Sequence, residues 1–206
     1  MCTFLGAGTL ISPEDIHQEH ITSHKIAYLE GYLWDNQNAK MAMKKMVDIC
    51  KSDNQKIAFT LSDLFCVDRH RDSFKELIEN DVDILFANED EIKAQCESDS
   101  FDKAIEYAKS LNMIVAITKA ADGSVIVNNN DVIEINPVQV DKVVDTTGAG
   151  DSWLAGFLAG ILRKQNVYQS ALLGAATAAC CVTRLGATDG LQDFDQIQKL
   201  IKDASV

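Results

Sequence analysis

The chain has 206 residues, of which 47% are hydrophobic and 24% are charged, and its formal net charge is −12. This length and composition predict one folded domain, residues 1–206, and exclude a disordered chain. The acidic balance argues against a nucleic-acid partner, which requires a basic surface, but a local positive potential is enough to bind a small anion.

The chain shows no sign of a membrane or secreted protein. No apolar run reaches the length of a transmembrane helix, and residues 1–11 lack the basic start of a signal peptide. The cysteines form no Cys-x-x-Cys pair and occur at positions 2, 50, 66, 96, 180 and 181. We therefore expect reduced, buried thiols, no membrane partner and a cytoplasmic protein.

The first elements are short. Residues 1–11 are predicted to form a strand or a loop that leads into one, and the segment 12–15, Ser-Pro-Glu-Asp, has the pattern of a helix start. His17, His20 and His24 follow at spacings of three and four, so on one continuous helix they would share a face suited to a metal. No cysteine or carboxylate clearly completes that set, and we expect these histidines on the solvated surface.

Strands and helices then alternate along the chain. Short apolar runs predict strands at 26–31, 56–61, 82–87 and 113–118, and a β-hairpin at 123–127 and 132–135. Helical patterns are found at 38–51, 73–78, 101–111, 150–163, 169–184 and 193–202. This alternation predicts an α/β fold with a mostly parallel sheet and right-handed crossovers.

The segment 145–151 reads Asp-Thr-Thr-Gly-Ala-Gly-Asp and opens an apolar helix. Gly148 and Gly150 let backbone N–H groups turn toward one point, and the free N–H groups and positive dipole of a helix start suit a phosphate. We expect Gly150 to need a positive φ, so that a side chain there would strain the backbone and fill the anion site.

Asp151 would repel a phosphate if it acted alone. It fits the site if it takes a proton from a hydroxyl that attacks the phosphate. The alternative is an acid in the first helical turn that the dipole favours.

The segment 145–151 and its apolar tail resemble the second signature of the PfkB-type, ribokinase-like kinases of carbohydrates and nucleosides. Three other motifs appear in family order: Asn88-Glu89-Asp90-Glu91, the loop from Thr118 to Gly123, and Thr183-Arg184-Leu185-Gly186-Ala187. The resemblance covers essentially the whole chain and is closer to the adenosine-kinase-like branch. It implies a ribokinase-like three-layer α/β/α fold and ATP-dependent phosphorylation of a hydroxyl on a small sugar or nucleoside.

The resemblance also implies roles for individual residues. The catalytic set is Asp151 with the backbone of Gly148, Ala149 and Gly150. The nucleotide set is Thr118, Gly123, Thr147, Gly174 and Gly186. Asn88 and Glu91 would organise Mg²⁺ through water, and Glu30 would contact the substrate. Asn88 also has the pattern of a helix cap, which is compatible with the metal role. In a parallel sheet the loops after the strands meet at one edge, where ligands bind.

Several positions depart from the family pattern. Ala120 stands where the adenine-side loop usually has its first glycine, and Gly174 stands where relatives often carry Asn or His. Relatives that bind a monovalent cation use the loop around Asp145 and Thr147, and Gly190 replaces a serine of that site, so a K⁺ site would be incomplete here.

Family members begin with a long stretch of early strands, a lid and residues that hold the acceptor. This chain resembles the part that follows, so we expect an N-terminally truncated fold with weak nucleotide binding and little turnover. The alternative function is a nucleotide-binding fragment without catalysis. A dinucleotide-binding oxidoreductase fits poorly, because the third glycine of its motif is missing.

Overall fold

The computed structural model describes residues 6–204 of the chain. The chain divides into two compact units, Met1–Ala116 and Ile117–Val206. The boundary falls inside a strand, β4 (Ile114–Thr118). The single domain over residues 1–206 stays a prediction, and the two units are described separately below.

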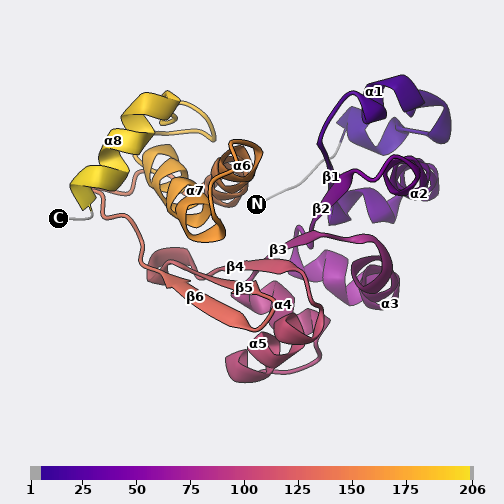
Figure 1. Cartoon of the computed structure of the whole chain (residues 1–206), viewed down its shortest axis with the longest axis horizontal. Coiled ribbons are helices and arrows are strands. Elements are labelled where there is room, and N and C mark those ends of the chain that lie inside the picture. The colour runs from indigo at the N-terminus through magenta and orange to yellow at the C-terminus, as the bar shows by residue number, and fades with distance from the viewer. Residues whose placement is uncertain (1–5, 205–206) are drawn as a thin grey trace. The chain divides into compact units, whose positions relative to one another are not determined.

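Six strands of five residues each form one sheet, in the order β1-β2-β3-β4-β5-β6 (Figure 1). They are β1 (Ile26–Glu30), β2 (Lys56–Thr60), β3 (Ile84–Asn88), β4, β5 (Ser124–Asn128) and β6 (Asp131–Ile135). β1 pairs with β2 and β2 with β3 in parallel, whereas β5 and β6 form an antiparallel hairpin. This arrangement confirms the predicted α/β class, the mostly parallel sheet and the hairpin.

The first unit carries the helices α1 (Gln18–Thr22), α2 (Gln37–Ser52), α3 (Leu64–Asp81), α4 (Glu89–Gln95) and α5 (Phe101–Ser110). Of these, α2 packs on β1 and β2, and α4 packs on β3. The apolar stripe of α2 is buried as its periodicity predicts, with Met43 and Val47 in the core. An aromatic cluster of Trp34, Phe59 and Phe74, with ring centroids 5.1 to 5.7 Å apart, adds shape-specific packing.

Helix α3 starts nine residues before the predicted helix at 73–78. Asp63 caps it, because its side chain accepts a hydrogen bond from the backbone N–H of Phe65 at 2.7 Å. Cys66 and Val67 in its first turns are buried like Phe74 further along. The polar residues between these buried ones obscured the first half of the helix in the sequence.

The N-terminal segment differs from its prediction. Residues Gly6–Leu10 form a 3₁₀ helix, and the next element is a second 3₁₀ turn at Pro13–Asp15, so the strand prediction is wrong for residues 6–11. Residues 1–5 lie outside the described part. Ser12 caps the second turn, as predicted, with its backbone N–H donating to the Asp15 carboxylate at 2.8 Å.

The three histidines do not share a continuous helix. α1 is only five residues long, so His17 is its N-cap and His24 lies beyond its end. All three, including His20, are exposed, as expected. Among residues 6–204, no three His, Cys, Asp or Glu side chains are grouped so that they could hold a metal ion.

The second unit carries α6 (Ala149–Leu162), α7 (Val167–Cys181) and α8 (Phe194–Ala204) beside the hairpin (Figure 1). α6 and α7 approach very closely: a Cβ added to Gly160 would lie 2.7 Å from the Cα of Ser170. α7 also packs on β5 and β6, and Ile197 of α8 joins Leu173 and Ala176 in a small core. The Arg163 guanidinium lies 4.1 Å from the centroid of the Phe194 ring.

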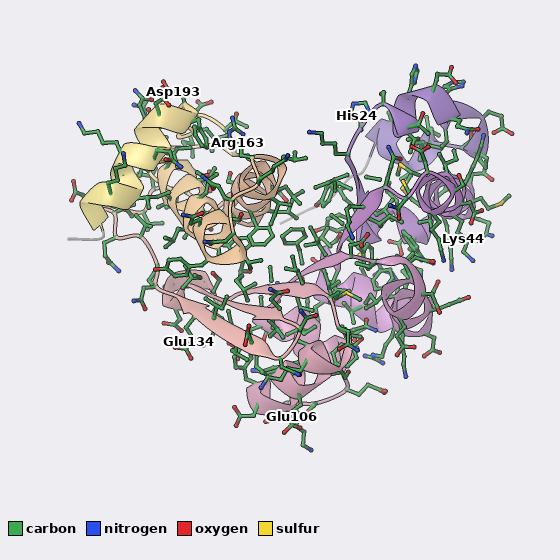
Figure 2. All side chains as sticks on the ribbon, viewed as in Figure 1. His24, Lys44, Glu106, Glu134, Arg163 and Asp193 are labelled. Carbon is green, nitrogen blue, oxygen red and sulfur yellow. The ribbon has the colours of Figure 1, made fainter. Side chains whose placement is uncertain are left out.

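Charged side chains and several large apolar ones, among them Phe65 and Leu185, are exposed. Figure 2 labels six exposed side chains: His24, Lys44, Glu106, Glu134, Arg163 and Asp193. In the part of the chain from residue 6 to 204, no helix combines the length and apolar character needed to span a bilayer. The five cysteines of that part are free, and Cys50, Cys66 and Cys181 are buried.

Candidate functional site

The start of α6 has the geometry of an anion site. Its N-cap, Gly148, has φ 76° and supplies no side-chain cap. A Cβ at Gly148 would lie 2.7 Å from the Cβ of Ala187, so any side chain there would displace the neighbouring loop. No side chain of the N-cap residue covers the start of the helix. The Ala149 N–H, one of the predicted phosphate ligands, already donates to the Thr146 carbonyl at 3.1 Å.

Gly150 differs from its prediction. Its φ is not positive, and a Cβ added to it would meet no atom within 4 Å. The expectation of a positive φ at Gly150 is therefore wrong, and Gly148 is the residue that needs this conformation. The open space at Gly150 lies where a ligand could approach the amides of the first helical turn.

Asp151 lies in the first turn of α6 and is exposed. Its carboxylate is stabilised there by the positive end of the helix dipole. The same position leaves the oxygens accessible to a hydroxyl group. Both interpretations of Asp151, helix acid and general base, are compatible with this geometry.

Asp145 connects the loop before α6 to the loop after α7. Its two carboxylate oxygens accept the backbone N–H groups of Thr147 and Gly186, each at 2.9 Å. These hydrogen bonds, that from Gly186 first, lower the pKa of Asp145. Gly186 adopts φ 92°, which turns its N–H toward the carboxylate. Asp145 and Thr147 therefore hold the loop together, and the K⁺ site stays a prediction.

The loop from Thr118 to Gly123 follows the end of β4. Gly123 has φ 84°, its carbonyl accepts the N–H of Lys119 at 2.8 Å, and an added Cβ would collide with the carbonyl oxygen of Ile135. Gly123 is thus required by the turn itself. Ala120, which replaces a family glycine, is held at φ 49°, so its methyl group makes the left-handed conformation unfavourable.

Two further glycines have packing explanations. Gly174 is buried in α7, where an added Cβ would lie 2.7 Å from the carbonyl oxygen of Trp153 and 3.1 Å from its ring. Gly190 lies against the carbonyl groups at the end of α7, and an added Cβ would collide with Cys180 O. Both glycines allow close backbone approach, and the nucleotide role of Gly174 stays a prediction.

In the first unit, Asn88 and Glu91 form a capping box at the start of α4. The Glu91 carboxylate accepts the backbone N–H of Asn88 at 2.9 Å and its side-chain amide at 2.7 Å. The side-chain oxygen Oδ1 of Asn88 accepts the Glu91 N–H at 2.8 Å. The helix-cap interpretation of Asn88 is confirmed.

Glu91 is a buried carboxyl group beside other carboxylates. It is 6% exposed, and burial raises its pKa to about 7, helped by the negative charges of Asp63 and Asp90 and opposed by the Asn88 N–H. A local excess of negative charge suits a hard cation. In residues 6–204 no three acidic, His or Cys side chains are close enough to bind one directly, so the metal role of Glu91 stays a prediction. Sequence reasoning missed Asp63, although an acid after a strand and before a helix was a visible signal.

Glu30 ends β1 and is half-buried. The loop after β1 is held by Ser62, whose hydroxyl accepts the N–H of Gly31 at 2.8 Å and whose carbonyl accepts the Tyr32 hydroxyl at 3.1 Å. Ser62 has φ 70°, an unusual conformation for serine. Glu30 thus begins an ordered loop at the carboxyl end of its strand.

The predicted site residues fall in both units. In the second unit, the loop 145–151 and Gly186 are brought together, and Thr118 ends the strand β4. In the first unit, Asn88 and Glu91 are in direct contact. The structure thus brings together the loop 145–151 with Gly186, and Asn88 with Glu91, while the functional roles of these residues stay predictions.

Residues 1–193 match the family described as pfkB family carbohydrate kinase. The chain belongs to this family. In sequence it is 34% identical over 122 residues to a nucleoside kinase of Methanocaldococcus jannaschii, which covers 59% of this chain and 39% of that protein.

Solved structures confirm the ribokinase-like fold of this pfkB family member. A probable sugar kinase of Rhizobium etli superposes with a TM-score of 0.87 and 32% identity, covering 96% of this chain and 59% of that chain. The adenosine kinase of Sinorhizobium meliloti gives 0.85 and 34%, covering 94% and 58%. The chain therefore spans less than two thirds of the length of these relatives.

Proposed function

We propose that this chain binds ATP with Mg²⁺ and takes part in transferring the γ-phosphoryl group to a hydroxyl of a small sugar or nucleoside. The observation that carries the proposal is the start of α6, where Gly148 is the N-cap, Gly150 leaves open space and Asp151 is exposed in the first turn. Names of relatives support this acceptor class: a nucleoside kinase, an adenosine kinase and a sugar kinase.

The amides at the start of α6 would hold the migrating phosphoryl group. They are oriented by the helix and fixed before the ligand arrives, so they stabilise developing negative charge without reorganising. Asp151 would accept the proton of the acceptor hydroxyl while the hydroxyl oxygen forms its bond to the γ-phosphorus and the bond from that phosphorus to ADP breaks. A carboxylate can do this while ionised, because it needs only hydrogen-bond reach to the hydroxyl.

Glu91 and Asn88, with Asp63 nearby, would organise Mg²⁺. Burial raises the Glu91 pKa most, and the negative charges of Asp63 and Asp90, which add to it, are the feature that fits a cation. Both Glu91 oxygens already accept hydrogen bonds, which favours contact through water. Bound Mg²⁺ would supply charge compensation for the phosphates. A putative ribokinase II of Escherichia coli, 21% identical, was crystallised in complex with ATP and Mg²⁺.

The test is ADP release from Mg·ATP by an active, complete form of the protein, in the presence of a panel of nucleosides and sugars. Asp151→Asn should lower turnover about 10²–10⁴-fold, because a positioned base contributes that much, and should leave ATP affinity nearly intact. Asp195→Asn is the matched control, since Asp195 is also an exposed acid in a first helical turn, that of α8. This control should keep the parent rate.

Two outcomes would contradict the proposal. An Asp151→Asn variant that keeps more than about a tenth of the parent rate would remove the general base. ATP binding without turnover with any acceptor would instead support the alternative, a nucleotide-binding protein without catalysis.

A further inference from the structure

The last residue of α7, Cys181, lies between the loop before α6 and the loop after α7. It is fully buried, and its Sγ is 3.1 Å from the carbonyl oxygen of Ala187 and 3.5 Å from that of Thr147. A thiol carries one hydrogen and is a weak donor, so the shorter bond to Ala187 is the principal one. The Thr147 carbonyl makes the second contact with the same sulfur.

Other contacts link the same two loops. The Val144 N–H donates to the Val182 carbonyl at 2.8 Å, and the Gly186 N–H donates to the Asp145 carboxylate at 2.9 Å. Ala187, whose carbonyl bonds Cys181, is also the residue that packs against Gly148. The thiol is thus one of several contacts that fix the loop that precedes α6.

The peptide between Thr147 and Gly148 explains why this position matters. It is planar and trans, because no cis peptide occurs in the described residues, so the Thr147 C=O and the Gly148 N–H point in opposite directions. When the carbonyl faces the buried sulfur, the amide faces away from it. Cys181 therefore helps set the direction of the Gly148 N–H.

We propose that Cys181 is a positioning residue for the phosphate-binding amides of α6. The proposal rests on the proposed function, since it assigns the Gly148 amide to a phosphate. The thiol acts through the Thr147–Gly148 peptide and through Ala187, without touching the ligand.

The adjacent cysteine provides a matched control. The Cys180 side chain is half-buried and packs against the small core of Leu173, Ala176 and Ile197. Burial raises the pKa of its thiol. Replacing Cys180 removes a sulfur at the end of the same helix and leaves the loop contacts of Cys181 in place.

The test compares Cys181→Ala, Cys181→Ser and Cys180→Ala in the full chain. Hydrogen exchange of the backbone amides at 146–149 is measured without nucleotide, and Mg·ATP affinity is measured by calorimetry. Cys181→Ala should exchange faster and bind Mg·ATP more weakly, each on the order of fivefold, the size that a weak sulfur hydrogen bond allows. Cys181→Ser, which keeps a donor, should restore both, and Cys180→Ala should match the parent.

If Cys181→Ala does not fold, Cys181→Val takes its place, because it fills the site without a donor. Equal exchange in the Cys181 variant and the Cys180→Ala control would overturn the inference. Faster exchange with unchanged Mg·ATP affinity would overturn it as well, since the loop would not position a ligand. A parent chain that exchanges slowly at 146–149 but binds no Mg·ATP would instead overturn the proposed function, and the positioning role with it.

Discussion

Different kinds of contact connect the elements within each of the two units. In the first unit, charged side chains connect neighbouring elements, for example Lys56 with Asp83, and the Arg69 guanidinium bonds both oxygens of Asp35 at 2.9 and 2.7 Å. In the second unit, the backbones of α6 and α7 approach so closely that Cβ atoms at Gly156 or Gly160 would lie within 3 Å of the partner helix.

This difference indicates where substitutions are tolerated. Exposed ion pairs contribute little, because water screens the charges and the side chains lose freedom. Close backbone contacts leave no room for another methyl group, and interiors relax only partly. The α6–α7 contact should therefore tolerate substitutions less than the exposed ion pairs of the first unit, and the candidate site beside it is built mainly from backbone groups.

Glu91 should be the exception in the first unit, because it is a buried acid. Its folded-state pKa of about 7 lies above the ordinary value of 4.5, so its contribution to stability is present below pH 4.5 and is lost as the pH rises through 7. A difference of this size corresponds to about 3 kcal/mol. Glu91→Gln should flatten the dependence of the unfolding free energy on pH between 5 and 8, as measured by urea denaturation.

Glu89→Gln is the control for this prediction, since Glu89 lies in the same helical turn and is half-buried. It should leave the pH dependence of the parent unchanged. Added Mg²⁺ should stabilise the parent at pH 8 more than Glu91→Gln, if Glu91 organises the metal as proposed. Identical pH profiles for the parent and Glu91→Gln would show that Glu91 titrates normally.

Gly160→Ala tests the close helix contact of the second unit. Alanine favours helices by about 1 kcal/mol over glycine, yet the added methyl would meet Ser170 backbone and side-chain atoms at 2.6 to 2.8 Å. We expect a net loss of about 2 kcal/mol in chemical unfolding. Gly150→Ala, in the same helix but with open space, should be stabilising. A gain in both variants would contradict the packing account.

Ala120→Gly should stabilise the second unit by up to about 1 kcal/mol. The left-handed conformation at φ 49° costs alanine about 1–2 kcal/mol, and part of the relief is offset by the greater freedom of glycine in the unfolded chain. Ala121→Gly, whose φ is not positive, is the control and should be destabilising. Thermal unfolding of the two variants measures the difference, and equal losses would refute the strain at Ala120.

The ion pair of Lys56 and Asp83 should give the smallest effect. Lys56 is 64% exposed, so a double-mutant cycle with Lys56→Met and Asp83→Asn should yield a coupling energy below about 1 kcal/mol. The cycle is needed because Asp83 also accepts the Ile57 N–H at 2.9 Å. A larger coupling, measured by urea unfolding, would break the contrast between the two units.

Much of the fold could be predicted because local patterns agree with it. Strands, the hairpin and most helices follow from apolar periodicity and turn residues. The sequence does not reveal the start of α3, because polar residues dilute its apolar stripe, nor the 3₁₀ helix at Gly6–Leu10, because its residues have no strong preference.

The motifs of the candidate site could be predicted from the sequence, but most of the contacts between its residues could not. The capping role of Asn88 and the loop 145–151 could be read from residue order. The carboxylate of Asp63 beside Glu91, the bond from Gly186 to Asp145 and the contact of Cys181 with Ala187 join residues distant in sequence or hidden in an irregular loop. Such contacts depend on tertiary packing, which periodicity does not encode.

Binding of Mg·ATP to Gly150→Asp tests most directly whether the start of α6 is a phosphate site. Gly150 has room for a side chain and an ordinary φ, and an acid in a first helical turn does not disturb the helix, so this variant should fold like the parent. Its added negative charge should weaken Mg·ATP binding at least about tenfold by repulsion, whereas Ala155→Asp, on the exposed side of α6, should bind like the parent. Equal affinities of the parent and Gly150→Asp in calorimetry would contradict the account.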